Sequence, residues 1–350
     1  SQTSFNGQKI LDGSFGNATF QVGANVGETI SVNLTTGVKT SQMGQIATAT
    51  NTVTAGALSA GDLTLAVGDG DAVSVGASSA GTKGIDGTLT EGGQAASSAY
   101  AKAEAINAAG ISGLSALAST EATIGFTNIT SAGGAGTYSL QINDVDVFDS
   151  AVVSSTFDID TVAAAINAKS GELGITAEVD GTDIVLTAAD GRTIQVDETL
   201  GGDTAGGVGD STNYGEITLA ASEVITVGGS APGTTGFSAG SIALSSDTLS
   251  STSVADVDGA NDAIQRVDAA LTSVSNLRSD FGAVQNRFES TITNLQTISE
   301  NLSASRGRIL DADFAAETAN LTKAQILQQA GTAILAQANS LPQAALSLLQ

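Results

Sequence analysis

The sequence predicts an α+β, multidomain protein in which long coiled-coil-type helices at the C-terminal end follow a β-rich middle with helix–β-meander repeats. Three observations support this fold class. Apolar residues recur at heptad spacing between residues 264 and 302. A short motif at residues 103–108 returns sixty positions later at 163–168. Much of the sequence between 39 and 230 consists of short apolar runs separated by Gly-rich turns, which is typical of strands and loops.

The first helix is predicted by apolar residues at gaps of three or four, close to 3.5 on average. That spacing indicates a coiled coil rather than a lone surface helix. Such a helix is about 60 Å long and needs partner helices to bury its apolar stripe. The stripe consists of Ile264, Val267, Leu271, Val274, Leu277, Phe281, Val284, Phe288, Ile292, Leu295, Ile298 and Leu302. We expect seven of them to make the coiled-coil contacts: Ile264, Leu271, Leu277, Phe281, Val284, Phe288 and Leu295.

A second helix is predicted after an interruption of the heptads. Residues 305–308 and 311–313 are polar, so we expect the first helix to end near Leu302 and another to run from about residue 313 to 340. Pro342 should disturb its end, and an apolar tail follows. Exposing that tail would be costly, which predicts burial between subunits. The residues expected at this inner contact are Ile326, Leu327, Ile334, Leu335, Leu348 and Leu349.

The sixty-residue repeat predicts two short helices, each followed by Gly and then by strands. In the second copy, strands at 175–179, 183–187 and 192–196 are separated by Asp180-Gly181 and Asp190-Gly191. Both dipeptides favour tight turns, so we expect a three-stranded antiparallel meander. Asp158 or Asp160 is expected to cap the second helix, and Ser253 to cap the long helix, with Asp256 in its first turn.

The beginning of the sequence is predicted to be β structure. Residues 5–11, 18–22 and 28–34 form strand-like runs, with Gly23 and Gly27 in the turn before the last. Alternation of Ile30, Val32 and Leu34 predicts a strand with one packed face. The predicted organisation is a β-hairpin region at 1–38, a β-rich region at 39–99, repeats at 100–235, the heptad helix at 253–304 and the inner-core helix with its tail at 305–350.

Composition excludes several functional classes. The sequence contains no Cys and no His, which rules out disulfides, thiolate chemistry, His-based triads and His zinc sites. Acidic residues outnumber basic ones 36 to 12, which argues against nucleic-acid binding. No apolar run is long enough to span a membrane as a helix. We interpret residues 68–71 as a turn, and Asp144, Asp146 and Asp149 as a solvated strand edge, because neither has the spacing of a calcium loop.

Several segments closely resemble bacterial flagellins. Residues 277–288 (LRSDFGAVQNRF), 324–332 (AQILQQAGT) and 335–343 (LAQANSLPQ) are similar to the C-terminal helices of that family. Residues 5–11 (FNGQKIL) and 21–25 (QVGAN) resemble its hairpin region. The sixty-residue repeat is similar to the insertion motif of flagellins and hook-associated proteins.

This resemblance implies a structural subunit of the bacterial flagellar filament, which polymerises outside the cell, supports motility, displays its middle region on the surface and has no enzyme activity. It implies export by the flagellar secretion system, self-association, and contacts with an export chaperone and with cap and hook-junction proteins. A host Toll-like receptor is a further implied partner, with Gln285, Arg287 and Asn294 as its candidate surface. No cofactor, nucleic acid or membrane insertion is implied.

Flagellins have a long helical segment before the hairpin, whereas this sequence starts at the hairpin. We therefore interpret it as a fragment, and expect the missing segment to be the partner of the heptad helix, which should be the least stably packed large element. Two other hypotheses remain open. One is an enzyme displayed in the middle region, for which paired-carboxylate glycoside chemistry is formally available. The other is an adhesin or a polysaccharide-binding flagellin-like protein that recognises its ligand through residues 40–230.

Overall fold

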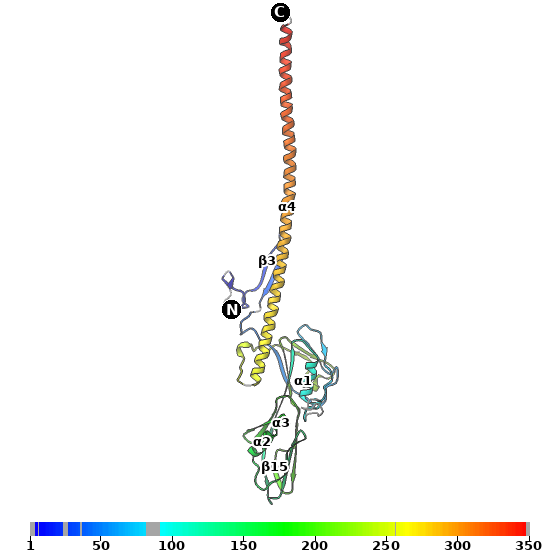
Figure 1. The fold of residues 1–350 in the computed structure, drawn as a ribbon, viewed down its shortest axis with the longest axis vertical. Coiled ribbons are helices and arrows are strands. Elements are labelled where there is room, and N and C mark those ends of the chain that lie inside the picture. Colours follow the sequence, from blue (N-terminus) through cyan, green and yellow to red (C-terminus); the bar gives the residue numbers. More distant parts are fainter. Residues whose placement is uncertain are drawn as a thin grey trace. The chain divides into compact units, whose positions relative to one another are not determined.

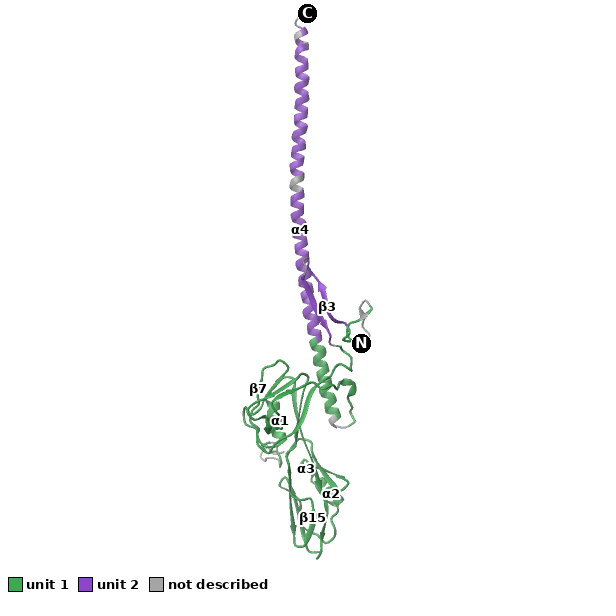
Figure 2. Ribbon diagram, turned by 180° about the vertical axis from the view of Figure 1, so that it is seen from behind, with its two compact units in different colours: residues 1–14, 36–276 green, residues 15–35, 277–350 purple. Residues whose placement is uncertain are grey.

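A computed structural model describes residues 4–5, 7–23, 27–35, 37–81, 92–255 and 257–347. The expectations for Asp256, Leu348 and Leu349 lie outside these residues. The chain forms two compact units (Figure 2). Unit 1 contains residues 1–14 and 36–276, and unit 2 contains residues 15–35 and 277–350. Each unit is described separately below.

Unit 1 is organised around β8 (Leu114–Gly125), a strand that serves two hydrophobic cores. Its first half pairs antiparallel with β17 (Glu216–Ala221), and its second half pairs antiparallel with β13 (Asp183–Ala188). The resulting sheet has the order β12-β13-β8-β17-β5. Its edges are β12 (Thr176–Asp180) and β5 (Ala47–Thr52). We call the two parts of unit 1 lobe A and lobe B.

Lobe A contains α1 (Ala99–Ala108), which is labelled in Figure 1, and a four-stranded sheet of order β19-β18-β6-β7. Its core buries Leu65, Ile106 and Leu219, which come from three different elements. The strands of this sheet are β6 (Thr64–Val67), β7 (Val73–Ser74), β18 (Ile225–Gly228) and β19 (Gly240–Ile242). Two 3-10 turns, η1 (Pro232–Thr235) and η2 (Leu249–Ser251), follow β18 and β19 in the sequence.

Lobe B contains α2 (Ile159–Ala168), α3 (Ser170–Leu173) and a second four-stranded sheet of order β11-β10-β14-β16. Tyr138 is fully buried in its core, and its ring meets the rings of Phe148 and Phe157 edge to face. The strands are β10 (Thr137–Ile142), β11 (Val145–Val152), β14 (Ile194–Gly201) and β16 (Ser211–Asn213), together with the pair β9 (Thr127–Ser131) and β15 (Thr204–Gly207).

The predicted repeat helices are confirmed as α1 and α2. Asp158 caps α2, since its carboxylate accepts a hydrogen bond from the Thr161 amide at 2.9 Å. The turn after Asp180 is also confirmed, because β12 and β13 form a hairpin with Asp180 opposite Asp183. Gly181 has a φ of 65°, a conformation that glycine adopts without steric cost.

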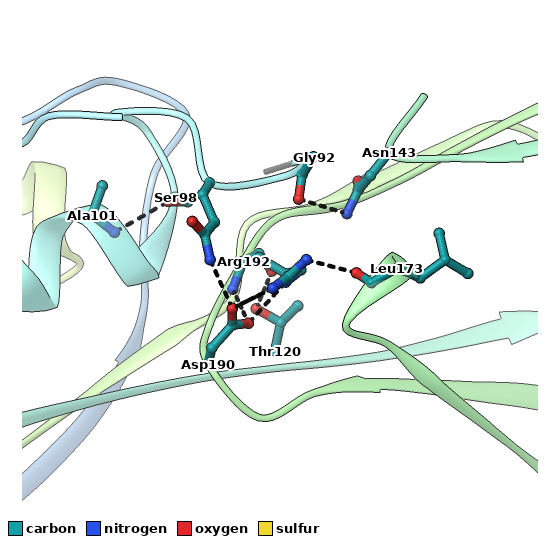
Figure 3. A network of polar contacts seen from close by, with 9 residues as sticks. Gly92, Ser98, Ala101, Thr120, Asn143, Leu173, Asp190 and Arg192 are labelled. Carbon is teal, nitrogen blue, oxygen red and sulfur yellow. Dashed lines mark hydrogen bonds and ion pairs between the residues drawn. The ribbon is translucent and has the colours of Figure 1, made fainter. Parts of the chain in front are cut away.

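The predicted three-stranded meander is wrong at its third strand. β14 pairs with β10 and β16 rather than with β13, because β8 already occupies the second edge of β13. After the turn at Asp190 the chain leads away from β13, and a network of polar contacts holds it in this path (Figure 3). The buried Arg192 guanidinium pairs with Asp190 at 2.8 Å and donates to the Leu173 carbonyl at 2.7 Å, while the Thr120 hydroxyl donates to the Arg192 carbonyl.

Residues 68–71 take the structure expected of them, whereas Asp144 lies in a turn and not, as expected, on a strand edge; Asp146 and Asp149 lie on the strand. Residues 68–71 form the turn after β6, with Gly68 at a φ of 59°. Asn143 and Asp144 form the tight turn between β10 and β11, both with positive φ. Asp146 then lies on β11, which is an edge strand. No group of acidic residues in the described ranges is arranged to hold a metal ion.

The C-terminal part of the chain is one continuous helix, α4 (Val257–Ser347), of 91 residues. The predicted break after Leu302 is therefore wrong. The polar residues there do not oppose helix, and the glycine Gly307 costs only about 1 kcal/mol relative to alanine. Ser253 does not cap this helix, which begins four residues later; its hydroxyl instead accepts from the Ala255 amide. None of the helices described is sufficiently long and apolar to cross a membrane.

The N-terminal β structure is confirmed in both units. In unit 1, β1 (Ser4–Phe5) pairs with β2 (Gln8–Lys9). In unit 2, β3 (Gly16–Gln21) and β4 (Thr29–Leu34) form an antiparallel hairpin. Burial alternates along β4, as the sequence pattern predicted.

Lys102 predicts a pH dependence of stability in lobe A. It is fully buried, and its ammonium donates to the carbonyls of Thr54 and Thr234, both at 2.7 Å. Burial lowers the pKa of Lys102 from 10.5 to about 8. Between these two values the unfolded chain binds more protons than the folded chain, so the free energy of unfolding should rise with pH. Denaturant titrations across this pH range should show the rise.

The matched variant is Lys102→Met, which keeps the length of the side chain but has no titrating group. It should be less stable, because two carbonyls lose their donor, and it should lack this rise with pH. The same pH dependence in both proteins would contradict the assignment to Lys102.

Candidate assembly surface

In unit 2, the β3–β4 hairpin packs directly on α4. Its buried face contacts three residues of the predicted seam, Phe281, Val284 and Phe288. The rings of Phe20 and Phe288 meet edge to face with their centroids 5.7 Å apart. Aromatic rings favour this geometry, and the pair adds stability beyond the area it buries. The hairpin is thus a partner for the seam that the heptad spacing did not indicate.

A groove of 500 Å³ lies beside this contact in unit 2. Its apolar residues include Val22, Ile30, Leu295 and Ile298, and Glu28 and Arg287 bring opposite charges. Of the three residues proposed from sequence for receptor contact, Arg287 and Asn294 line the groove. Gln285 is exposed on α4 and is not among the lining residues.

In unit 1, the start of α4 is held by residues outside the predicted seam. Arg266 is only 5% exposed, and its guanidinium donates to Asp262 at 2.6 Å and to the carbonyls of Gly44 at 3.2 Å and Asp247 at 2.8 Å. Ala269 packs nearby against Ile46 and Ala220. An arginine between heptad positions normally signals a solvated face, so the sequence carried no sign of this anchor.

The seam residues of this segment face the solvent instead. Ile264 and Leu271 are 61% and 62% exposed. Further along, in unit 2, Leu277 and Leu295 are half-buried. The helix therefore buries a small, polar-edged face in unit 1 and leaves larger apolar side chains uncovered.

Large apolar side chains are exposed along the whole C-terminal half of α4. Phe314, the most exposed of its large side chains, is 77% accessible. More than half of each of the following side chains is exposed: Ile309, Leu310, Phe314, Leu321, Ile326, Leu327, Ile334, Leu335, Leu341 and Leu346. Exposed apolar surface on this scale marks a site of protein–protein contact. We call these ten residues, together with Ile264 and Leu271, the assembly surface.

The comparisons with known proteins agree with this interpretation. A family model described as the bacterial flagellin C-terminal helical region matches residues 264–349. The B-type flagellin of Pseudomonas aeruginosa is 37% identical over 376 aligned residues, which cover 99% of this chain and 74% of that relative. This chain belongs to the flagellin family. A flagellin of Salmonella choleraesuis is 35% identical and covers 100% of this chain and 74% of its own length.

A shorter alignment shows a higher sequence identity. The flagellin of Salmonella muenchen is 61% identical over 87 residues, which are 25% of this chain and 17% of that relative. As a flagellin, the chain is a structural subunit that self-assembles into the extracellular flagellar filament and supports motility. It is a structural protein, not an enzyme.

The Phe20–Phe288 contact predicts a measurable coupling in unit 2. Each single substitution to alanine should lower the free energy of unfolding of the hairpin–helix contact, because apolar area is lost. In a double-mutant cycle the two losses should be non-additive by about 1 kcal/mol, since the second substitution removes a ring that no longer has its partner. Hydrogen exchange of the β3 and β4 amides would report both quantities, and strictly additive losses would contradict a direct ring contact.

Proposed function

We propose that the assembly surface of α4 is the contact through which this flagellin polymerises, and that helices of neighbouring flagellin chains cover it. Heptad spacing selects a helical partner, because knobs from one helix fit holes formed by another. The coiled-coil contacts are assigned to Ile264, Leu271, Leu277 and Leu295. The inner contacts are assigned to Ile326, Leu327, Ile334 and Leu335; Leu348 and Leu349, which lie outside the described residues, are proposed for the same contact from the sequence alone.

The observation that carries this proposal is the exposure of the side chains of the assembly surface, as defined above, within a regular helix. Fully burying one leucine or isoleucine contributes about 1.5–3 kcal/mol. Many such contacts, repeated along a filament, give a stable polymer although each is weak. Phe281, Val284 and Phe288 act differently in this proposal. They fix the hairpin on α4 and shape the surface that a neighbour meets.

We also propose the finer partners that family membership suggests. These are export through the flagellar secretion system, with a chaperone that shields the apolar helix before assembly, and contacts with cap and hook-junction proteins. The support is the same exposed surface, since an uncovered apolar helix needs a partner at each stage before polymerisation.

Leu327→Asp should abolish filament formation while unit 1 keeps its thermal stability. A carboxylate at an exposed position costs the free chain little, but burying it unpaired between subunits is strongly unfavourable. The matched control is Gln329→Asp, which adds the same charge two residues along and so on a different side of the helix. Electron microscopy after salt-induced assembly of complete flagellin chains measures the outcome. Normal filaments from Leu327→Asp would refute the proposed contact.

A host Toll-like receptor is proposed to contact Gln285, Arg287 and Asn294. Arg287→Ala should weaken receptor signalling, because the exposed guanidinium beside the groove offers charge-assisted hydrogen bonds to a partner. Arg306→Ala is the control, since Arg306 is also an exposed arginine of α4 but lies outside this segment. Reporter-cell titrations with both variants test the contact, and equal potency would count against it.

A further inference from the structure

Among the strand edges of unit 1 that have no neighbouring strand in the described residues, two belong to β12 and to the first half of β8. β12 is the first strand of its sheet and pairs only with β13. The first half of β8 pairs with β17 on one side, while β13 reaches only residues 120–125 on the other. The second side of residues 114–119 is therefore also free of strand pairing. Such edges expose unpaired amides and carbonyls, which can pair with another chain.

At each of these edges, the side chain of an asparagine from the repeat motif forms hydrogen bonds to the backbone of one strand residue. The Asn167 amide, at the end of α2, donates to the Ala177 carbonyl and accepts from the Ala177 amide, both at 2.8 Å. The Asn107 amide, at the end of α1, makes the same two bonds to Ala116 at 2.8 and 2.9 Å. The two asparagines are sixty positions apart, at equivalent places in the repeat.

The geometry shows which side of each strand is occupied. In an antiparallel strand the amide and the carbonyl of one residue point to the same side. Ala177 belongs to an edge strand and Ala116 to the half-paired part of β8, so the groups bonded to the asparagines face the open sides. A side-chain amide offers one donor and one acceptor, which is what a residue of a neighbouring strand would offer.

Stability alone gives a weak reason for this arrangement. Both asparagines are exposed, and water would satisfy the same backbone groups. The net contribution of such hydrogen bonds is only about 1 kcal/mol each. Water, however, does not prevent a second strand from docking, whereas a side chain fixed on a helix does.

We propose that Asn107 and Asn167 are edge guards that keep copies of this chain from pairing through their β-strands. The excluded partner is a second copy, because β12 can pair with itself. Antiparallel pairing of two β12 strands centred on Ala177 would place Thr176 opposite Glu178, with no like charges in contact. A polymer of flagellin holds many copies close together, so an unguarded edge would join neighbours or whole filaments laterally.

Asn167→Ala tests the guard on β12. Filaments of this variant should bundle laterally and show a severalfold rise in thioflavin T fluorescence over the unmodified chain. Asn128→Ala is the control, since it makes the same chemical change at another exposed position of lobe B. Electron microscopy and fluorescence of all variants are compared at one protein and salt concentration.

The double variant Asn167→Ala/Ala177→Pro separates edge pairing from loss of stability. Proline removes the very N–H that an incoming strand would use, and it is tolerated when that N–H faces outward from an edge. The double variant should return to the fluorescence and the filament separation of the unmodified chain. No rise in Asn167→Ala, or a rise that persists in the double variant, would overturn the proposal.

Discussion

The structure depends on one imbalance, which is that α4 carries more apolar side chains than the described part of the chain covers. A helix stabilises itself through backbone hydrogen bonds, but in water most helical stability in proteins comes from packing of an apolar face. Here that packing exists only in limited places. In the proposed contact, the remaining side chains, such as Phe314 and Leu327, gain stability when a further helix packs on them. Assembly would then contribute to the folding free energy of the subunit.

The chain attaches itself to α4 in two chemically different ways. In unit 2 the attachment is apolar and aromatic, through Phe20 and Phe288. In unit 1 it is a buried arginine that binds two loop carbonyls, with small alanines beside it. The apolar contact tolerates small shifts of the ring. The hydrogen-bonded contact does not, because its strength falls steeply with distance and angle.

Local patterns in the sequence predicted local structure well. The heptads gave a helix, the repeat gave α1 and α2 with the cap at Asp158, and alternation gave the packed face of β4. Sequence reasoning failed where the outcome depended on distant partners. β14 left the meander because β8 had taken the edge of β13, and Arg266 was buried against the carbonyl of Gly44, which is far away in the chain. The helix was wrongly predicted to end near residues 305–308, because polar residues do not by themselves end a helix.

The candidate site was predictable in type but not in detail. Apolar residues on a long helix indicated an association surface, and the exposure of Ile326 and Leu327 agrees with it. What no periodicity could show is that Phe281, Val284 and Phe288 pack on a hairpin of the same chain. The paired hydrogen bonds of Asn107 and Asn167 to strand residues could not be predicted either, because both residues look like ordinary polar residues at helix ends in the sequence.

The path of β8 also bears on how such a chain changes length. Ser119 and Glu216 are directly paired across β8 and β17, so the chain leaves lobe A and re-enters it at adjacent points. Most of the residues between them belong to lobe B, while Thr120, Gly191, Arg192 and Tyr214 lie at the junction with lobe A. A short turn in place of residues 120–215 would join β8 to β17 as a plain hairpin. Lobe B is therefore an insertion between two paired strands, and it can be gained, lost or exchanged while β8 and β17 stay paired in lobe A.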